Sequence, residues 1–96
     1  MEVTISKSKK PEKRLQADFA GKRITHFGQK GGSTFVDHKS QQKKEAWLAR
    51  HKVNEDWRDL QSAGALARHL LWSQKTLAAS VAALNQRQNK YKFKLR

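Results

Sequence analysis

Lysine and arginine are the residues of this sequence best suited to chemistry, both by number and by grouping. The 96 residues include 21 Lys+Arg against 8 Asp+Glu, a formal net charge of +13 at pH 7. That exceeds the magnitude of about 2–8 that keeps a small domain in solution, so a polyanionic partner is favoured over a merely solvated surface. Their cationic groups suit phosphate contacts, which position a protein without reading sequence. The candidate nucleic-acid-binding residues are Lys7, Lys9, Lys10, Lys13, Arg14, Lys22, Arg23 and Lys30, with Lys43 and Arg50 in support.

Histidines offer a second kind of chemistry. Asp37-His38, followed by Asn54 and His69, resembles the residue types of ββα-metal nucleases, in which one His activates water and others hold the ion. In that motif the second His lies on the helix directly after the hairpin, whereas a whole helix intervenes in this sequence. We therefore expect these histidines to be structural and predict no metal ligand.

No other catalytic arrangement is visible. Glu55, Asp56 and Asp59 cluster beside Arg58, which indicates helix capping and ion pairing instead of general acid–base work. No glycine-rich segment matches a nucleotide-binding loop, and with no cysteine the chain has neither disulfides nor a Cys-based zinc site. We expect a non-enzyme without a cofactor.

The residues up to 28 show the period of two that is typical of strands with one buried face. Strands are predicted at 2–6, 13–20 and 23–28, with a basic, Pro11-containing loop between the first two. In the third strand Ile24 and Phe27 cannot both point inward without a bulge. Such a sheet cannot stand alone and requires a cover.

A helical period begins after the glycines at 31–32. Ser40 is a candidate N-cap for a helix reaching roughly Lys52, and Ser62 caps a second, buried helix over 63–72. Ser73 or Thr76 begins a third helix, in which residues 77, 81 and 84 form an apolar stripe. The three tryptophans are expected to pack in the core. Gly64, inside the second helix, indicates close approach by a neighbouring element.

These patterns predict an α+β fold: a small antiparallel N-terminal β-meander covered by about three α-helices. Residues 1–89 form a single basic domain, and residues 90–96 are either a short added C-terminal strand or a basic arm. In that tail Tyr91 and Phe93 alternate with lysines, and packing as a strand is favoured over stacking on bases. Neither a signal peptide nor an apolar run of membrane-spanning length is visible, so we expect no membrane span.

Several segments together resemble one family, the small basic proteins of unassigned function from large nucleocytoplasmic DNA viruses of algae and amoebae. The resemblance spans roughly residues 3–87 and departs at His69, where the family tends to place an aromatic residue. The segments that carry it are His26-Phe27-Gly28, Asp37-His38-Lys39, Lys43-Lys44 through Ala49-Arg50-His51, Asn54-Glu55-Asp56-Trp57, Ser62-Ala63-Gly64-Ala65-Leu66 and Leu71-Trp72.

The resemblance implies a viral, virion-associated protein, present in the host cytoplasm or nucleus during infection, and names no catalytic residue. Together with the charge it leads to the expectation of a non-catalytic protein that binds nucleic acid, DNA above all, through phosphates. The alternative is a minor capsid or cement protein whose basic surfaces contact acidic viral structural proteins and whose tail adds a strand to a neighbour. The sequence does not set the oligomeric state.

Overall fold

A computed structural model describes all residues from 1 to 96. The protein contains one four-stranded β-sheet. The strands are β1 (Glu2–Lys7), β2 (Lys13–Phe19), β3 (Ile24–Gln29) and β4 (Lys92–Leu95), in the order β3-β2-β1-β4. The first three form an antiparallel meander, whereas β4 lies parallel to β1. The predicted meander is confirmed, and the C-terminal tail is a strand of the same sheet and not a free arm.

Four helices follow the meander: α1 (Phe35–His38), α2 (Gln41–His51), α3 (Ala63–Leu70) and α4 (Leu77–Arg87). The last three begin after the N-caps Ser40, Ser62 and Thr76, whose side chains each accept a hydrogen bond from a backbone N–H of the first turn. The predicted α+β class is therefore confirmed, and the short α1 is an addition to it.

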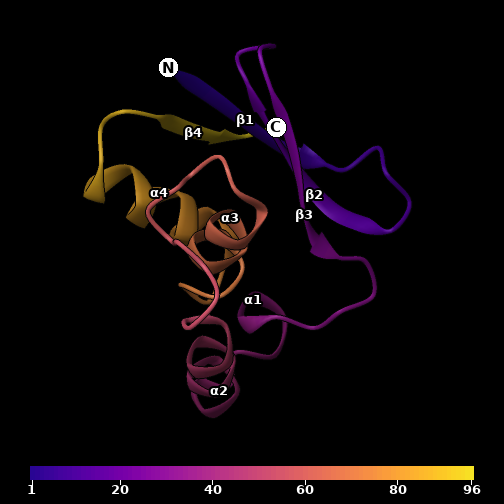
Figure 1. The fold of residues 1–96 in the computed structure, drawn as a ribbon, viewed down its shortest axis with the longest axis vertical. Coiled ribbons are helices and arrows are strands. Elements are labelled where there is room, and N and C mark those ends of the chain that lie inside the picture. Colours follow the sequence, from indigo (N-terminus) through magenta and orange to yellow (C-terminus); the bar gives the residue numbers. More distant parts are fainter.

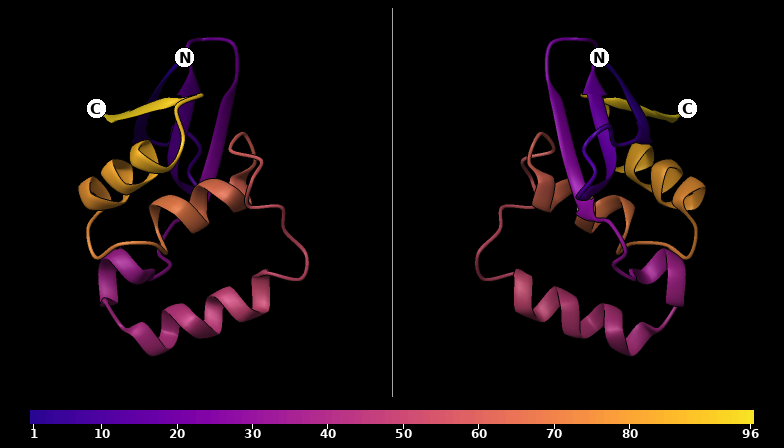
Figure 2. Two further views of the ribbon diagram at one scale, coloured as in Figure 1. Left: turned by 90° about the vertical axis from the view of Figure 1, so that its left-hand side faces the viewer. Right: turned by 90° about the vertical axis from the view of Figure 1, so that its right-hand side faces the viewer.

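One face of the sheet carries the core. Val3 and Ile5 of β1, Ala17 and Phe19 of β2, and Phe27 of β3 are at most 1% exposed. Ile24 points to the other face and is 49% exposed. Of the two apolar residues of β3, only Phe27 is therefore buried, and the strand needs no bulge. α3 and α4 cover this face, as Figures 1 and 2 show, and α3 buries Ala65, Leu66 and Leu70.

Side chains of α4 hold the C-terminal strand in place. The amide of Asn85 donates to the carbonyl of Phe93 at 2.9 Å and accepts the Phe93 N–H at 2.9 Å. The ring of Tyr91 packs edge-on against Phe19, and both Tyr91 and Phe93 are buried. The aromatic residues of the tail therefore pack inside the protein, as the strand prediction requires.

α2 lies apart from the sheet, at the bottom of Figures 1 and 2. It buries no residue completely, and tryptophans attach it to the rest of the protein. The Trp47 ring is stacked on Trp72 at 4.9 Å between centroids, and Trp57 lies parallel to it at 6.3 Å. On the same helix the ammonium of Lys44 donates to the carbonyl of Ser73 at 2.7 Å, which fixes one flank of α2.

A carboxylate explains the glycine inside α3. A Cβ built on Gly64 would lie 2.8 Å from the carboxyl carbon of Glu55. That carboxylate accepts the Trp57 indole N–H at 3.0 Å and lies 3.4 Å from Nδ1 of His51. The close approach predicted from Gly64 is confirmed, since a larger residue there would require the Glu55 carboxylate to move away from the first turn of α3.

No helix of this protein combines the length and the apolar character needed to cross a membrane.

Candidate nucleic-acid interface

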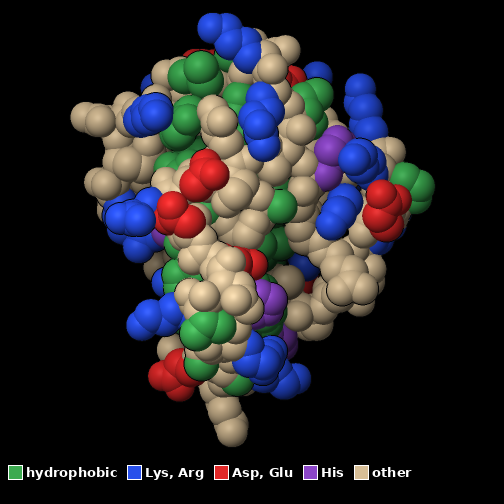
Figure 3. Space-filling view, in the orientation of Figure 1, with side chains coloured by type: hydrophobic (Ala, Val, Ile, Leu, Met, Phe, Trp, Pro, Cys, Tyr) green, Lys and Arg blue, Asp and Glu red, His purple; other side chains and the backbone are tan.

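The sheet topology gathers most of the predicted cationic residues at one end of the sheet. The β1–β2 loop and the end of β3 meet there, because Lys13 pairs with Gln29 and the Lys30 N–H donates to the carbonyl of Glu12 at 3.2 Å. This basic end consists of Lys7, Lys9, Lys10, Lys13 and Lys30. Figure 3 shows Lys and Arg side chains over the β1–β2 loop, at the right of the molecule, with an acidic side chain among them.

The β1–β2 loop has a defined conformation that presents these lysines. The Lys9 N–H donates to the side-chain oxygen of Gln16 at 3.1 Å, and the Ser8 hydroxyl lies 2.7 Å from Nδ1 of His26. The loop therefore folds onto the face of the sheet opposite the core, where it leaves Gln16 only 5% exposed. This role of His26 was not predicted from the sequence.

No ammonium group of the basic end takes part in an ion pair, and none donates a hydrogen bond within the protein. Four of the five lysines are exposed, and Lys13 is half-buried. The one acidic residue of the loop, Glu12, leaves these five like charges in excess, and they repel one another, so an anion bound there would stabilise the arrangement. The basic end is thus a surface of net positive charge with the chemistry that phosphate groups require.

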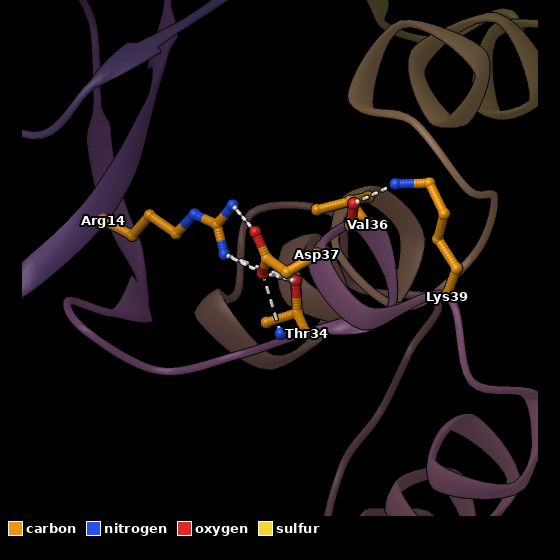
Figure 4. A network of polar contacts seen from close by, with 5 residues as sticks. All are labelled: Arg14, Thr34, Val36, Asp37 and Lys39. Carbon is orange, nitrogen blue, oxygen red and sulfur yellow. Dashed lines mark hydrogen bonds and ion pairs between the residues drawn. The ribbon is translucent and has the colours of Figure 1, made fainter.

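Arg14 has a different role from its neighbours. Its guanidinium donates to both carboxylate oxygens of Asp37 on α1, at 2.6 and 2.8 Å, and to the Thr34 hydroxyl at 3.3 Å (Figure 4). The same carboxylate accepts the Thr34 N–H at 2.8 Å, and Lys39 closes the turn by donating to the carbonyl of Val36. The Arg14 guanidinium is the main reason that the pKa of Asp37 lies well below its usual range. Arg14 therefore connects β2 to α1 and is not a free cation.

Lys22 and Arg23 lie at the other end of the sheet, on the β2–β3 turn, and so do not join the basic end. The Lys22 ammonium makes no contact with an acidic group, whereas the Arg23 guanidinium donates to the Thr25 hydroxyl at 3.2 Å. The structure thus places the ten candidate residues in separate parts of the molecule: the basic end, the β2–β3 turn, the ion pair of Arg14 and helix α2.

Lys43 and Arg50 form one flank of α2, turned about a third of the helix circumference away from the anchored Lys44. They are seven positions apart, which places them on the same side of a helix two turns from each other. Both are exposed, and neither forms an ion pair. Arg50 faces the loop after β3 and lines a cleft together with residues of that loop, whereas Lys43 is not part of the cleft.

The cleft between the β3–α1 loop and α2 has a volume of about 390 Å³. Gln29, Gly32 and Ser33 form one wall, Arg50 and His51 form the other, and Leu71, Trp47 and Trp72 are part of an apolar floor. At the base of the first wall Gly28 has φ +78, and a Cβ there would lie 2.9 Å from Leu71. Glycine at 28 therefore allows the chain to cross Leu71 closely and turn out of the sheet.

The cleft residues Gln29, Ser33 and His51 were not predicted from the sequence. The sequence signal near Gln29 and Ser33 was the flexible Lys30-Gly31-Gly32 segment, which indicated that its backbone could approach a phosphate closely. Nothing in it indicated that α2 would form the opposite wall of a cleft. His51 had no such signal, because its place depends on how Trp47 packs. The basic end and this cleft together form the candidate interface.

The histidines of the nuclease hypothesis are engaged in structural contacts. Nδ1 of His38 accepts the Ser40 N–H at 2.9 Å. Nε2 of His69 lies 2.8 Å from the Trp57 carbonyl, and its Nδ1 lies 2.7 Å from a guanidinium nitrogen of Arg87. Burial is the main reason that the pKa of His69 is lowered, so its ring is neutral at pH 7. No three His, Asp or Glu side chains come together in a way that would hold a metal ion.

The fold and the interface define a small basic α+β domain with a cationic end beside an apolar-floored cleft. The chain belongs to the family described as Family of unknown function (DUF5754), which matches residues 3–51, from β1 to the end of α2. This match covers the basic end and both walls of the cleft, and it assigns no reaction. No curated protein and no solved structure matches the chain.

Proposed function

We propose that this protein binds nucleic acid, DNA above all, through phosphate contacts of the basic end, without catalysis. The observation that carries the proposal is that five lysines are brought together from the β1–β2 hairpin and the end of β3, beside a single carboxylate, Glu12, and that none of them forms an ion pair. Arg50 adds positive charge on the far wall of the cleft, and Lys43 adds it elsewhere on the same flank of α2. Flexible lysines on loops bind phosphates without selecting a base sequence.

The resemblance to small basic proteins of large DNA viruses supports a more specific version of this proposal. The protein would then accompany DNA in the virion, and would be in the host cytoplasm or nucleus during infection. The cement-protein alternative has less support, because the tail on which it drew pairs with β1 of its own sheet.

A salt titration tests the proposal. Duplex DNA affinity should fall linearly on a log–log plot against salt, and each lost phosphate contact should reduce the slope by about 0.9. The test variant replaces Lys7, Lys9 and Lys10 by Gln and should flatten the slope by about 2 to 3. The control replaces Lys52, Lys75 and Lys92, three exposed lysines outside the interface, and removes the same net charge.

The control should retain nearly all of the wild-type slope. Equal slopes for the two variants would show that only net charge matters and would reject the basic end as the site. Absence of any DNA binding at low salt would reject the function itself.

A further inference from the structure

The cleft beside the basic end holds several hydrogen-bond donors that the protein does not use. Ser33 makes no hydrogen bond within the protein through either its backbone N–H or its hydroxyl. The side-chain amide of Gln29 and the guanidinium of Arg50 likewise have no partner. These groups stand on facing walls of one cleft, so a ligand lying in it meets donors from both sides.

The floor of the cleft suits a flat, partly apolar group. Trp47 is stacked on Trp72 and, at 4.1 Å, on His51, so these rings offer a ligand mainly their edges. The edge of an aromatic ring carries positive potential, which favours the carbonyl oxygens and ring nitrogens of a base. Leu71 and Ala67 complete the apolar surface. The volume of about 390 Å³ lies in the range of small-molecule sites, about 300–1,000 Å³.

We infer that the cleft takes one unpaired nucleotide of a nucleic-acid strand, an inference that rests on the proposed function. The base lies against the Trp47–Trp72–Leu71 floor, with Gln29 and Ser33 donating to its acceptors. Arg50 and the neighbouring Lys30 bind the flanking phosphates. The other lysines of the basic end lie beside Lys30, because the Lys30 N–H bonds to the carbonyl of Glu12 in the β1–β2 loop. They bind the part of the strand that adjoins this nucleotide.

Base pairing decides which form of nucleic acid fits this site. In a duplex each base is stacked and paired, and a protein reaches its faces only by extruding it, which costs a few kcal/mol per base. In a single strand the bases are already free to leave the stack. The cleft therefore predicts that the protein prefers single strands to duplexes. Phosphate neutralisation alone predicts the opposite, because a duplex carries the denser charge.

The test compares a single-stranded DNA of about ten nucleotides with the duplex of the same sequence, at one salt concentration. Wild-type protein should bind the single strand about tenfold more tightly. Gln29→Leu and Ser33→Leu remove donors from the cleft without changing charge. Each should bring the two affinities to within about twofold of each other.

The matched control is Gln86→Leu, the same substitution at an exposed position of α4. It should keep the single-strand preference. All three variants should keep the wild-type duplex affinity and salt slope, which shows that they are folded and that the basic end still works.

The outcomes separate this inference from the proposed function. Equal or tighter binding of the duplex by wild-type protein, with a normal salt slope, overturns the cleft inference and leaves the phosphate interface standing. The cleft inference is also overturned if the Leu variants at 29 and 33 keep the single-strand preference. Failure to bind either DNA overturns both.

Discussion

The guanidinium of Arg14 on β2 and the carboxylate of Asp37 on α1 form a bidentate ion pair, with N–O distances of 2.6 and 2.8 Å. The pair joins residues 23 positions apart and is the main polar link between the sheet and the helical segment that follows it (Figure 4). Asp37 also accepts the Thr34 N–H and so caps α1. One carboxylate thus fixes both the fold of α1 and its place beside the sheet.

Replacing Asp37 by Ala should lower the free energy of unfolding by about 1–3 kcal/mol, because it removes the cap of α1 and leaves Arg14 without its partner. Urea unfolding followed by tryptophan fluorescence measures the effect. Glu12→Ala is the matched control, because Glu12 is exposed and in no ion pair, and it should change stability by less than about 0.5 kcal/mol. A similar loss in both variants would contradict the role of the pair.

The same pair predicts loss of stability in acid. The pKa of Asp37 is lower in the folded protein than the ordinary value of 3.8, so the unfolded chain binds a proton there first. The pair's contribution is therefore complete above that value and is lost as pH falls below it. Urea unfolding between about pH 5 and pH 2 should show a steeper decline for wild type than for Asp37→Asn, which has no carboxylate to protonate. Parallel curves would reject the prediction.

Local signals were enough to predict the helix starts, and long-range contacts explain what was missed. Ser40, Ser62 and Thr76 act through backbone groups a few residues away, so their side chains predict α2, α3 and α4 from sequence. For α4 the sequence left Ser73 as an alternative start, and the structure places the N-cap at Thr76. The four residues of α1 are too short for a periodic pattern, and they depend on Arg14 from another element.

The same distinction applies to the candidate site. The basic β1–β2 loop is contiguous in sequence, and pairing of β2 with β3 adds Lys30 to it. Lys22 could have been at either end of the sheet until the strand directions were known. The cleft required knowledge of how Trp47 packs on Trp72, a contact between α2 and the residues after α3 that no local pattern encodes.

Gly64 and Glu55 should be energetically coupled. Gly64→Ala alone forces the Glu55 carboxylate away from the added Cβ and weakens its hydrogen bond to Trp57. We expect this to offset the helix-forming advantage of Ala, so that the free energy of unfolding changes by less than about 0.5 kcal/mol. In a Glu55→Ala background the obstruction is gone, and Ala is favoured over Gly in a helix by about 1 kcal/mol. The same substitution should therefore stabilise the second protein. A double-mutant cycle by urea unfolding measures the difference between the two backgrounds, and additive effects would contradict the contact.

His69 should make the fold less stable in mild acid. Burial is the first cause that lowers its pKa below the ordinary 6.5, and the positive charges of Arg87 and Arg68 lower it further, against the raising effect of the Trp57 carbonyl. Because its pKa is lower in the folded protein, His69 binds a proton more readily in the unfolded chain. The free energy of unfolding should therefore decline as pH falls from about 7 toward 5. NMR titration of the ring should give a pKa below 6.5 that rises in Arg87→Gln. In His69→Gln, where the side-chain amide can still donate to Trp57, the difference in unfolding free energy between these two pH values should shrink. A ring that titrates at or above the ordinary value would refute the assignment.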